Sequence, residues 1–281
     1  MDAFEFVREL AAELSEGAIE LPSFPEVAAR VQKVLSENDS DSARVVRVLG
    51  AEPVLATRVL SMANAAALNP GTKPVSDLRT AVTRLGFDSL RSACIGFAMA
   101  QIQRAKAFKG IERHLSALWQ QSVLVAALCF VVARRTDKVS ADTAMLAGLV
   151  HGVGKLYILT HSMKHPALFG DQDTYQRIVR EWHGNIAKAL LENWYMAEEI
   201  VYAVHSYEDT SRDLRGTAAV LADVLEVANM LSACQEAPDN VPALLVGRKA
   251  VARLGLNDEI CQSLLVESGE ELAALRDALG H

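Results

Sequence analysis

Apolar residues recur along this chain every three or four positions, and this spacing constrains the fold more than any other feature. An early example is the stripe formed by Phe4, Val7, Leu10 and Leu14. Residues at this spacing lie on one face of an α-helix, where they can pack against a core. Runs that alternate strictly between apolar and polar residues, as half-buried strands do, are missing. The sequence therefore predicts an all-α fold.

The predicted helices form two groups and a C-terminal extension. Short helices separated by proline and glycine breaks fill residues 1–108. Longer helices are expected at about 112–136, 140–149, 153–161, 172–181, 184–192, 196–205 and 214–234. After a break at 237–242, a final helical pair is expected at about 243–253 and 257–279. We expect two helical lobes, about 1–108 and 109–236, followed by a helical extension, 237–281.

Composition narrows the range of environments and partners. The net charge is −7, which argues against extended contact with nucleic-acid phosphates or anionic lipids. The N-terminal residues lack a signal peptide, and the longest apolar run, 123–133, is shorter than the roughly 20 residues of a membrane span. The four cysteines each lie among apolar residues, as in a reduced compartment. We expect a cytoplasmic protein without membrane insertion.

Histidines are concentrated in the second predicted lobe. Five of the seven lie on separate predicted helices or at their ends: His151, His161, His165, His183 and His205. Together with a later carboxylate such as Asp223, they could converge inside a helical bundle on a metal ion. The alternative is that each is a hydrogen-bonded core or surface residue. We expect His161 and His165, which lie in a polar stretch, to be exposed.

The segment 148–155 contains three glycines, His151 and Lys155. A glycine inside a helix costs about 1 kcal/mol relative to alanine, so Gly152 and Gly154 indicate a helix junction or close backbone packing. The segment lacks the spacing of a phosphate-binding loop, and no strand precedes it.

Ordered motifs over about residues 17–215 resemble the HDOD domain family. The segments are LPSFPEVA (21–28), EPVLA (52–56), VLSMANAA (59–66), PVS (74–76), AGLVH (147–151) and AVH (203–205). The residues that carry the resemblance are Pro22, Pro25, Pro53, Asn64, Gly86, Trp119, Gly148, Gly154, Lys155 and Trp194. The family is similar in fold to the HD metal phosphohydrolases, which implies an HD-domain-like bundle for the second lobe.

The sequence departs from the HD metal-binding pattern at three positions. HD phosphohydrolases hold one or two divalent metals with histidines, a His-Asp pair and a later Asp, and the Asp of the pair bridges the metals. Here Gly152 follows His151, Gln121 stands where the resemblance places a histidine, and Ser206 follows His205.

The resemblance therefore implies a degenerate site without metal or other cofactor. The remaining candidate positions are His151, His183, His205 and Asp223. One interpretation of Lys155 is a cation at a helix end. The other is that its ammonium occupies the position that a metal ion has in HD phosphohydrolases, in which case it should lie near the His151 and His205 rings.

The resemblance implies a non-catalytic bacterial signal-transduction module that binds a regulatory or signalling protein. Cyclic-di-GMP signalling, motility, virulence and stress regulation are the pathways that it implies. Two alternatives stay open. One is a metal-dependent phosphohydrolase acting on a nucleotide or cyclic dinucleotide. The other is a nucleotide- or nucleic-acid-binding adaptor that uses the locally basic residues 79–113. Trp182, Trp194 and Tyr195 could line a partner groove, and the C-terminal helices could form a homodimer.

Overall fold

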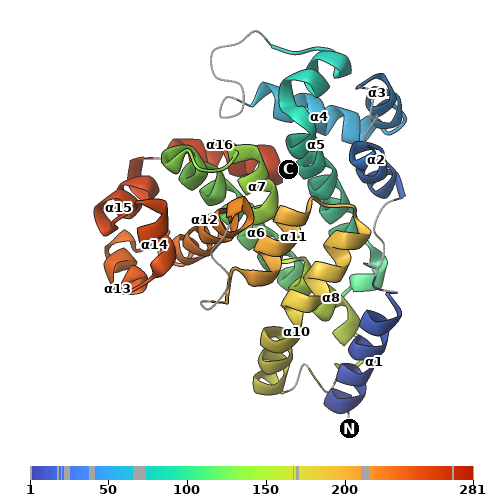
Figure 1. Cartoon of the computed structure of the whole chain (residues 1–281). Helices are drawn as coiled ribbons and strands as arrows, with labels where there is room; N and C mark the ends of the chain where they lie inside the picture. Colours follow the sequence, from blue (N-terminus) through green and yellow to red (C-terminus); the bar gives the residue numbers. More distant parts are fainter. Residues whose placement is uncertain are drawn as a thin grey trace.

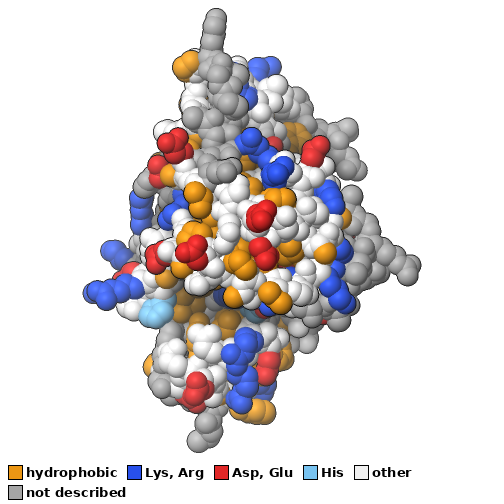
Figure 2. Space-filling model, turned by 90° about the vertical axis from the view of Figure 1, so that its left-hand side faces the viewer, with side chains coloured by type: hydrophobic (Ala, Val, Ile, Leu, Met, Phe, Trp, Pro, Cys, Tyr) orange, Lys and Arg blue, Asp and Glu red, His pale blue; other side chains and the backbone are white. Residues whose placement is uncertain are grey.

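The computed structural model describes residues 2–17, 19, 21, 26–37, 42–65, 74–166, 168, 171–209, 216–267 and 269–280. Every regular element among these residues is a helix, so the predicted all-α class is confirmed (Figure 1). Acidic and basic side chains are interspersed with small apolar areas on the face shown in Figure 2. Among the residues of that face that the structure describes, no extended surface carries a single charge.

The first lobe is built around a long kinked helix. It contains α2 (Glu26–Ser36), α3 (Ser42–Gly50), α4 (Pro53–Asn64) and α5 (Leu78–Arg104). Gly86 bends α5 with φ 71° and ψ 175°, a conformation that glycine adopts without the steric cost of a side chain. Beyond this kink, α5 reaches the second lobe and packs against α7. The short helix η1 (Lys106–Phe108) then leads into that lobe.

The second lobe consists of long helices close to their predicted positions. They are α6 (Glu112–Thr136), α7 (Ala141–Val150), α8 (Val153–Ser162), α10 (Gln172–Asn193), α11 (Glu198–Ser206) and α12 (Gly216–Ser232). The prediction of separate helices at 172–181 and 184–192 was wrong, because α10 continues through Gly184. A Cβ at this glycine would lie 3.5 Å from the His205 carbonyl oxygen on α11, which is an ordinary contact, so the glycine lies inside a continuous helix and does not mark a helix end.

The N-terminal helix α1 (Asp2–Glu16) packs on the second lobe, although the sequence placed it in the first. Glu9 accepts a hydrogen bond from His165 at 3.1 Å, and Glu13 accepts one from the Tyr157 hydroxyl. The Phe6 and His165 rings meet edge to face, 5.2 Å between centroids. His165 is consequently buried, not exposed as predicted. The boundary near residue 108 stays a prediction.

The C-terminal extension contains more and shorter helices than the expected pair. They are η2 (Pro238–Asn240), α13 (Val241–Leu245), α14 (Lys249–Leu254), α15 (Asp258–Glu267) and α16 (Gly269–Gly280). Gly247 and Gly255, both at φ 72°, separate α13 from α14 and end α14. The last helix, α16, returns to pack against α4, α5 and α6 (Figure 1).

Two helical stretches are long and apolar enough to cross a membrane by length and composition alone, Glu112–Thr136 and Ala141–Ser162. In this fold 72% and 94% of their most apolar windows are buried inside the protein. They form the core of the second lobe, as expected for a soluble-type helical domain.

Candidate functional site

His151 lies at the junction between α7 and α8, with only 2% of its surface exposed. Its Nδ1 lies 2.6 Å from the Gly148 carbonyl oxygen. Since a carbonyl only accepts, Nδ1 carries the proton and Nε2 keeps a lone pair in the neutral ring. Burial, followed by the charge of Lys155, lowers the pKa of His151 from 6.5 to about 4. The imidazole is therefore neutral at physiological pH.

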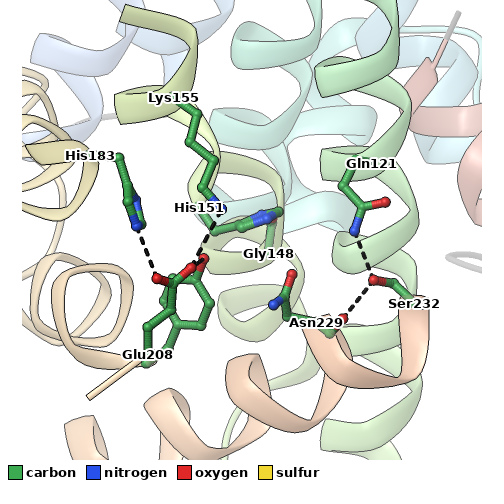
Figure 3. Close-up of polar contacts among 9 residues, drawn as sticks. Gln121, Gly148, His151, Lys155, His183, Glu208, Asn229 and Ser232 are labelled. Carbon is green, nitrogen blue, oxygen red and sulfur yellow. Dashed lines mark hydrogen bonds and ion pairs between the residues drawn. The ribbon is translucent and has the colours of Figure 1, made fainter. Parts of the chain in front are cut away.

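Glu208, in the turn that follows α11, is the centre of the polar cluster beside His151 (Figure 3). Its carboxylate lies 3.4 Å from Lys155 Nζ and 3.0 Å from His183 Nε2, and it accepts a 2.6 Å hydrogen bond from the Tyr207 hydroxyl. The His183 hydrogen bond is the main cause that holds the pKa of Glu208 far below its usual range. The carboxylate is consequently ionised, and a protein cation stands next to it.

Sequence reasoning missed Glu208 because no quoted motif contains it. The only local signal was a carboxylate three residues after His205. The same geometry bears on the hypothesis for Lys155. Its ammonium pairs with Glu208 and acts electrostatically on His151, as expected of a cation in the vacant position. The hydrogen-bond partner of His205 is Asn185 and not Glu208, so the expected nearness of Lys155 to the His205 ring stays a prediction.

His205 and Asp223 do not converge on His151. His205 is exposed, and its Nε2 lies 3.0 Å from Asn185 Oδ1. Asp223 is buried and binds the Arg253 guanidinium through both carboxylate oxygens, with Nε 2.6 Å from Oδ2. The carboxylate that could have served as the later metal ligand is therefore neutralised by an arginine of the C-terminal extension.

Gln121 and Ser206 also make hydrogen bonds outside the Glu208 cluster. Gln121 Nε2 donates to Ser232 Oγ at 2.8 Å, joining α6 to α12 on the far side of Figure 3 from His183. Ser206 donates back to the Tyr202 carbonyl oxygen of its own helix at 2.7 Å. Of the seven candidate positions, the structure brings only His151 and His183 to the Glu208 cluster.

The Gly152 position lies against an apolar niche. A Cβ there would lie 2.8 Å from Ser122 Oγ. The surrounding side chains come from α5, α6, α7 and α8: Ile95, Met99, Leu118, Trp119, Leu149, Val153 and Leu156. A carboxylate in this niche would lose its hydration and would find only the Ser122 hydroxyl as a polar partner among the residues that line it, which is costly.

These observations test whether the residues present fit the divalent metal of HD proteins. Such a metal needs several negative or neutral ligands around one point. Here Lys155 supplies a positive charge beside His151, and Asp223 is paired with Arg253. Among the described residues, no three His, Cys, Asp or Glu side chains are grouped as a metal site. The residues do not fit the metal.

The other motif residues have structural roles where the structure describes them. Asn64 binds both the backbone N–H and the carbonyl oxygen of Val75, at 2.7 and 2.8 Å, and so connects the end of α4 to that segment. Pro53 opens α4. Gly148 and Gly154 permit close helix crossings, and Trp194 is buried. Pro22 and Pro25 lie outside the described residues.

Comparison with known proteins identifies the family and the fold. A sequence model of the HDOD domain matches residues 21–210. A Shewanella amazonensis protein, described provisionally as a metal-dependent phosphohydrolase, has a similar structure (TM-score 0.75, 24% identity, 99% of each chain covered). An HDOD domain protein of unknown function from Geobacter sulfurreducens follows (TM-score 0.67, 24% identity, 96% of this chain and 97% of that one). No curated protein matches. At these identities, the structural likeness shows a shared fold.

Proposed function

This chain belongs to the HDOD family, and from that premise we propose that it is a non-catalytic module of bacterial signal transduction that acts by binding another protein. The partner is a cytoplasmic regulatory or signalling protein, of the kind involved in motility, virulence, stress or cyclic-di-GMP responses. The observation that carries the proposal is the contact between Lys155, Glu208 and His183 beside His151.

This contact supports a structural role for the former metal centre. Lys155 provides a positive charge next to Glu208, where a metallophosphohydrolase would keep a divalent cation. An ammonium neutralises the carboxylate but offers no open coordination position for a water or a phosphate oxygen. The apolar niche at Gly152 excludes the bridging carboxylate from the same region.

Tyr195 supports the interaction part of the proposal. It lies in the turn between α10 and α11, is 54% exposed and adopts φ 55°, a conformation that costs a non-glycine residue free energy. Trp194 and Met196 beside it are buried, so the groove predicted from these aromatics is largely core. Tyrosine often dominates binding energy at interfaces, and we therefore assign this exposed ring as a contact residue.

The catalytic part of the proposal is tested by metal analysis on the whole chain, purified without chelator. Inductively coupled plasma mass spectrometry should find far less than one transition metal per chain, and the protein should not hydrolyse bis(p-nitrophenyl) phosphate. Gly152→Asp, which restores the missing carboxylate, should bind no metal either and should lower the melting temperature, because the new side chain meets Ser122 and the apolar niche. Stoichiometric metal that disappears in His151→Ala would overturn the proposal.

The interaction part is tested by a pull-down against the signalling proteins of the host. Wild-type protein and Val266→Ala, a control that truncates another exposed side chain, should recover the same partner. Tyr195→Ala should recover it at least about tenfold less well, as expected for an aromatic anchor. Equal recovery by all three proteins would remove Tyr195 from the interface, and no reproducible partner for any of them would contradict the proposed mode of action.

A further inference from the structure

The two most exposed large apolar side chains that the structure describes are Phe4 and Val246, at 77% and 75%. Phe4 lies on α1, which buries Phe6 and Leu10 against the second lobe. Successive helix residues are about 100° apart, so Phe4 and Phe6 point to opposite sides of α1. Val246 lies in the turn between α13 and α14. Both exposed side chains lie outside the family match of residues 21–210, in parts of the chain that the HDOD motifs do not include.

Val246 lines a cavity of about 580 Å³ between α12, α13 and α14, and this cavity is basic. Arg248, Lys249 and Arg253 also line it, and they are three of the four lysines and arginines in the C-terminal extension, 237–281. None of the acidic side chains that the structure describes in that extension lines the cavity. Its one carboxylate, Glu226 of α12, acts electrostatically on Arg253. Apolar surface therefore lies beside Arg248 and Lys249, which are exposed and form no ion pair with the described part of the chain.

The residues around Phe4 carry the opposite charge. Asp2 and Glu5 are its nearest charged neighbours in the sequence, and α1 contains five acidic residues but one basic residue, Arg8. Glu5 lies 3.7 Å from Arg8, but these side chains are 52% and 67% exposed, and such ion pairs contribute little stability. Glu5 can therefore exchange this partner for another cation at little cost.

The α1 helix does not reach the basic cavity of its own chain. It packs against α10, and its Glu9 and Glu13 contact His165 and Tyr157 of the second lobe. Figure 1 shows α1 well separated from α13 and α14. A contact between Phe4 and the cavity therefore needs a second copy of the chain.

We propose that two copies of this chain form a dimer in which Phe4 of each copy enters the basic cavity of the other. The two acidic side chains beside Phe4 then face Arg248 and Lys249, and the ring covers the apolar wall. Complementary charges fix the orientation of such a contact, and burial of the exposed apolar side chains favours it. A two-fold axis lets each copy use both surfaces, so the assembly closes as a dimer. This inference goes beyond the proposed function, and its failure would leave that function in place.

The first test is sedimentation velocity of the whole protein at about 1–100 µM, the range in which a small interface dissociates. We expect wild type to associate reversibly to a dimer. Phe4→Ala should raise the dissociation constant by about tenfold or more, because it removes the aromatic anchor. Val54→Ala, which truncates an exposed apolar side chain on α4, is the matched control and should leave the dissociation constant unchanged. A wild type that stays monomeric throughout, or a dimer that Phe4→Ala does not weaken, would overturn the proposal.

An exchange of charges distinguishes this contact from any other dimer interface. The double variant Arg248→Glu/Lys249→Glu has two acidic surfaces, and Asp2→Lys/Glu5→Lys has two basic ones. Each double variant alone should be monomeric, because like charges then face each other. Mixed in equal amounts, the two should form a heterodimer, because each acidic surface then meets a basic one.

The control for net charge is Lys33→Glu/Arg47→Glu, which reverses two exposed cations of the first lobe. It changes the net charge as much as the cavity variant does and should still dimerise. If this control is also monomeric, or if the mixture of folded charge variants stays monomeric, the proposed contact is wrong.

Discussion

His151 is kept neutral by its surroundings, and this distinguishes it from a histidine that works as a charged group. Its ring is buried, donates to the Gly148 carbonyl oxygen and has the Lys155 ammonium nearby. Both burial and the neighbouring cation disfavour the imidazolium. His151 is therefore a neutral, hydrogen-bonded part of the core.

This environment makes the stability of the protein depend on pH. The pKa of His151 is about 4 in the folded protein and 6.5 as its ordinary value. Between these values the unfolded chain binds a proton that the folded protein excludes, so stability is full above pH 6.5 and falls as pH decreases toward 4. Between about pH 7 and about pH 5, urea unfolding of wild type should lose about 2 kcal/mol more than His151→Gln, which cannot titrate.

His151→Gln also controls for the other histidines whose pKa values are lowered in the folded protein. The pKa values of His161 and His205 are lowered by burial as well, but both residues remain in His151→Gln. Their contributions therefore cancel in the comparison. Equal pH dependence of the two proteins would show that folding does not lower the pKa of His151, contrary to its burial.

At the scale of helices, Gly154 sets how closely α8 approaches α10. A Cβ at this position would overlap the His183 carbonyl oxygen and would lie 2.8 Å from the carbonyl carbon. The obstacle is backbone, so it cannot be relieved by a change of rotamer. This crossing places His183 on α10 within reach of Glu208, which is why the glycine matters for the polar cluster.

Two alanine substitutions on these helices should have opposite effects. Gly154→Ala should destabilise the protein by about 2–4 kcal/mol in urea unfolding, because α8 must move away from α10. Gly184→Ala adds a Cβ in ordinary contact, 3.5 Å from the nearest atom, inside α10. It should stabilise the protein by about 0.5–1 kcal/mol, since alanine favours a helix over glycine. Destabilisation of similar size by both would contradict the assigned crossing.

At the scale of the whole molecule, α16 is held to the first lobe by a buried arginine. Arg58 on α4 is 9% exposed and donates to the Leu279 carbonyl oxygen, near the C-terminal end of α16. Carbonyl groups at a helix end lack partners within the helix, so the guanidinium satisfies one of them. Gly96 on α5 leaves the space, because a Cβ there would overlap the guanidinium. Burial lowers the pKa of Arg58 to about 10, so it stays charged at neutral pH.

Removing this arginine should loosen α16 without unfolding the chain. In Arg58→Met, amide hydrogen exchange in α16 should be about tenfold faster than in wild type, as expected from the loss of a charged hydrogen bond, while exchange in α10 stays the same. Arg30→Met is the matched control, because Arg30 makes an exposed ion pair with Glu26 on its own helix. Unchanged exchange in α16 would mean that its apolar face alone holds it in place.

The sequence by itself determined the all-α class and most helices of the second lobe. These helices follow from local periodicity, which needs no contact between distant residues. That Gly152 replaces an HD aspartate stays a prediction from the family resemblance. Gly184 was misread because the glycine signal is the same for a helix end and for a position inside a continuous helix. Only the backbone around it distinguishes the two.

Only the tertiary structure decided which polar residues meet. In the folded chain Glu208 contacts Lys155 and His183, and Asp223 forms an ion pair with Arg253. His205 is exposed and bonds to Asn185. The tertiary structure also placed α1 on the second lobe and α16 across both. These outcomes depend on how far each helix is rotated about its axis and where helices cross. Periodicity identifies the buried face of a helix but not the helix that covers it, and this is why the polar cluster beside His151 was not visible in the sequence.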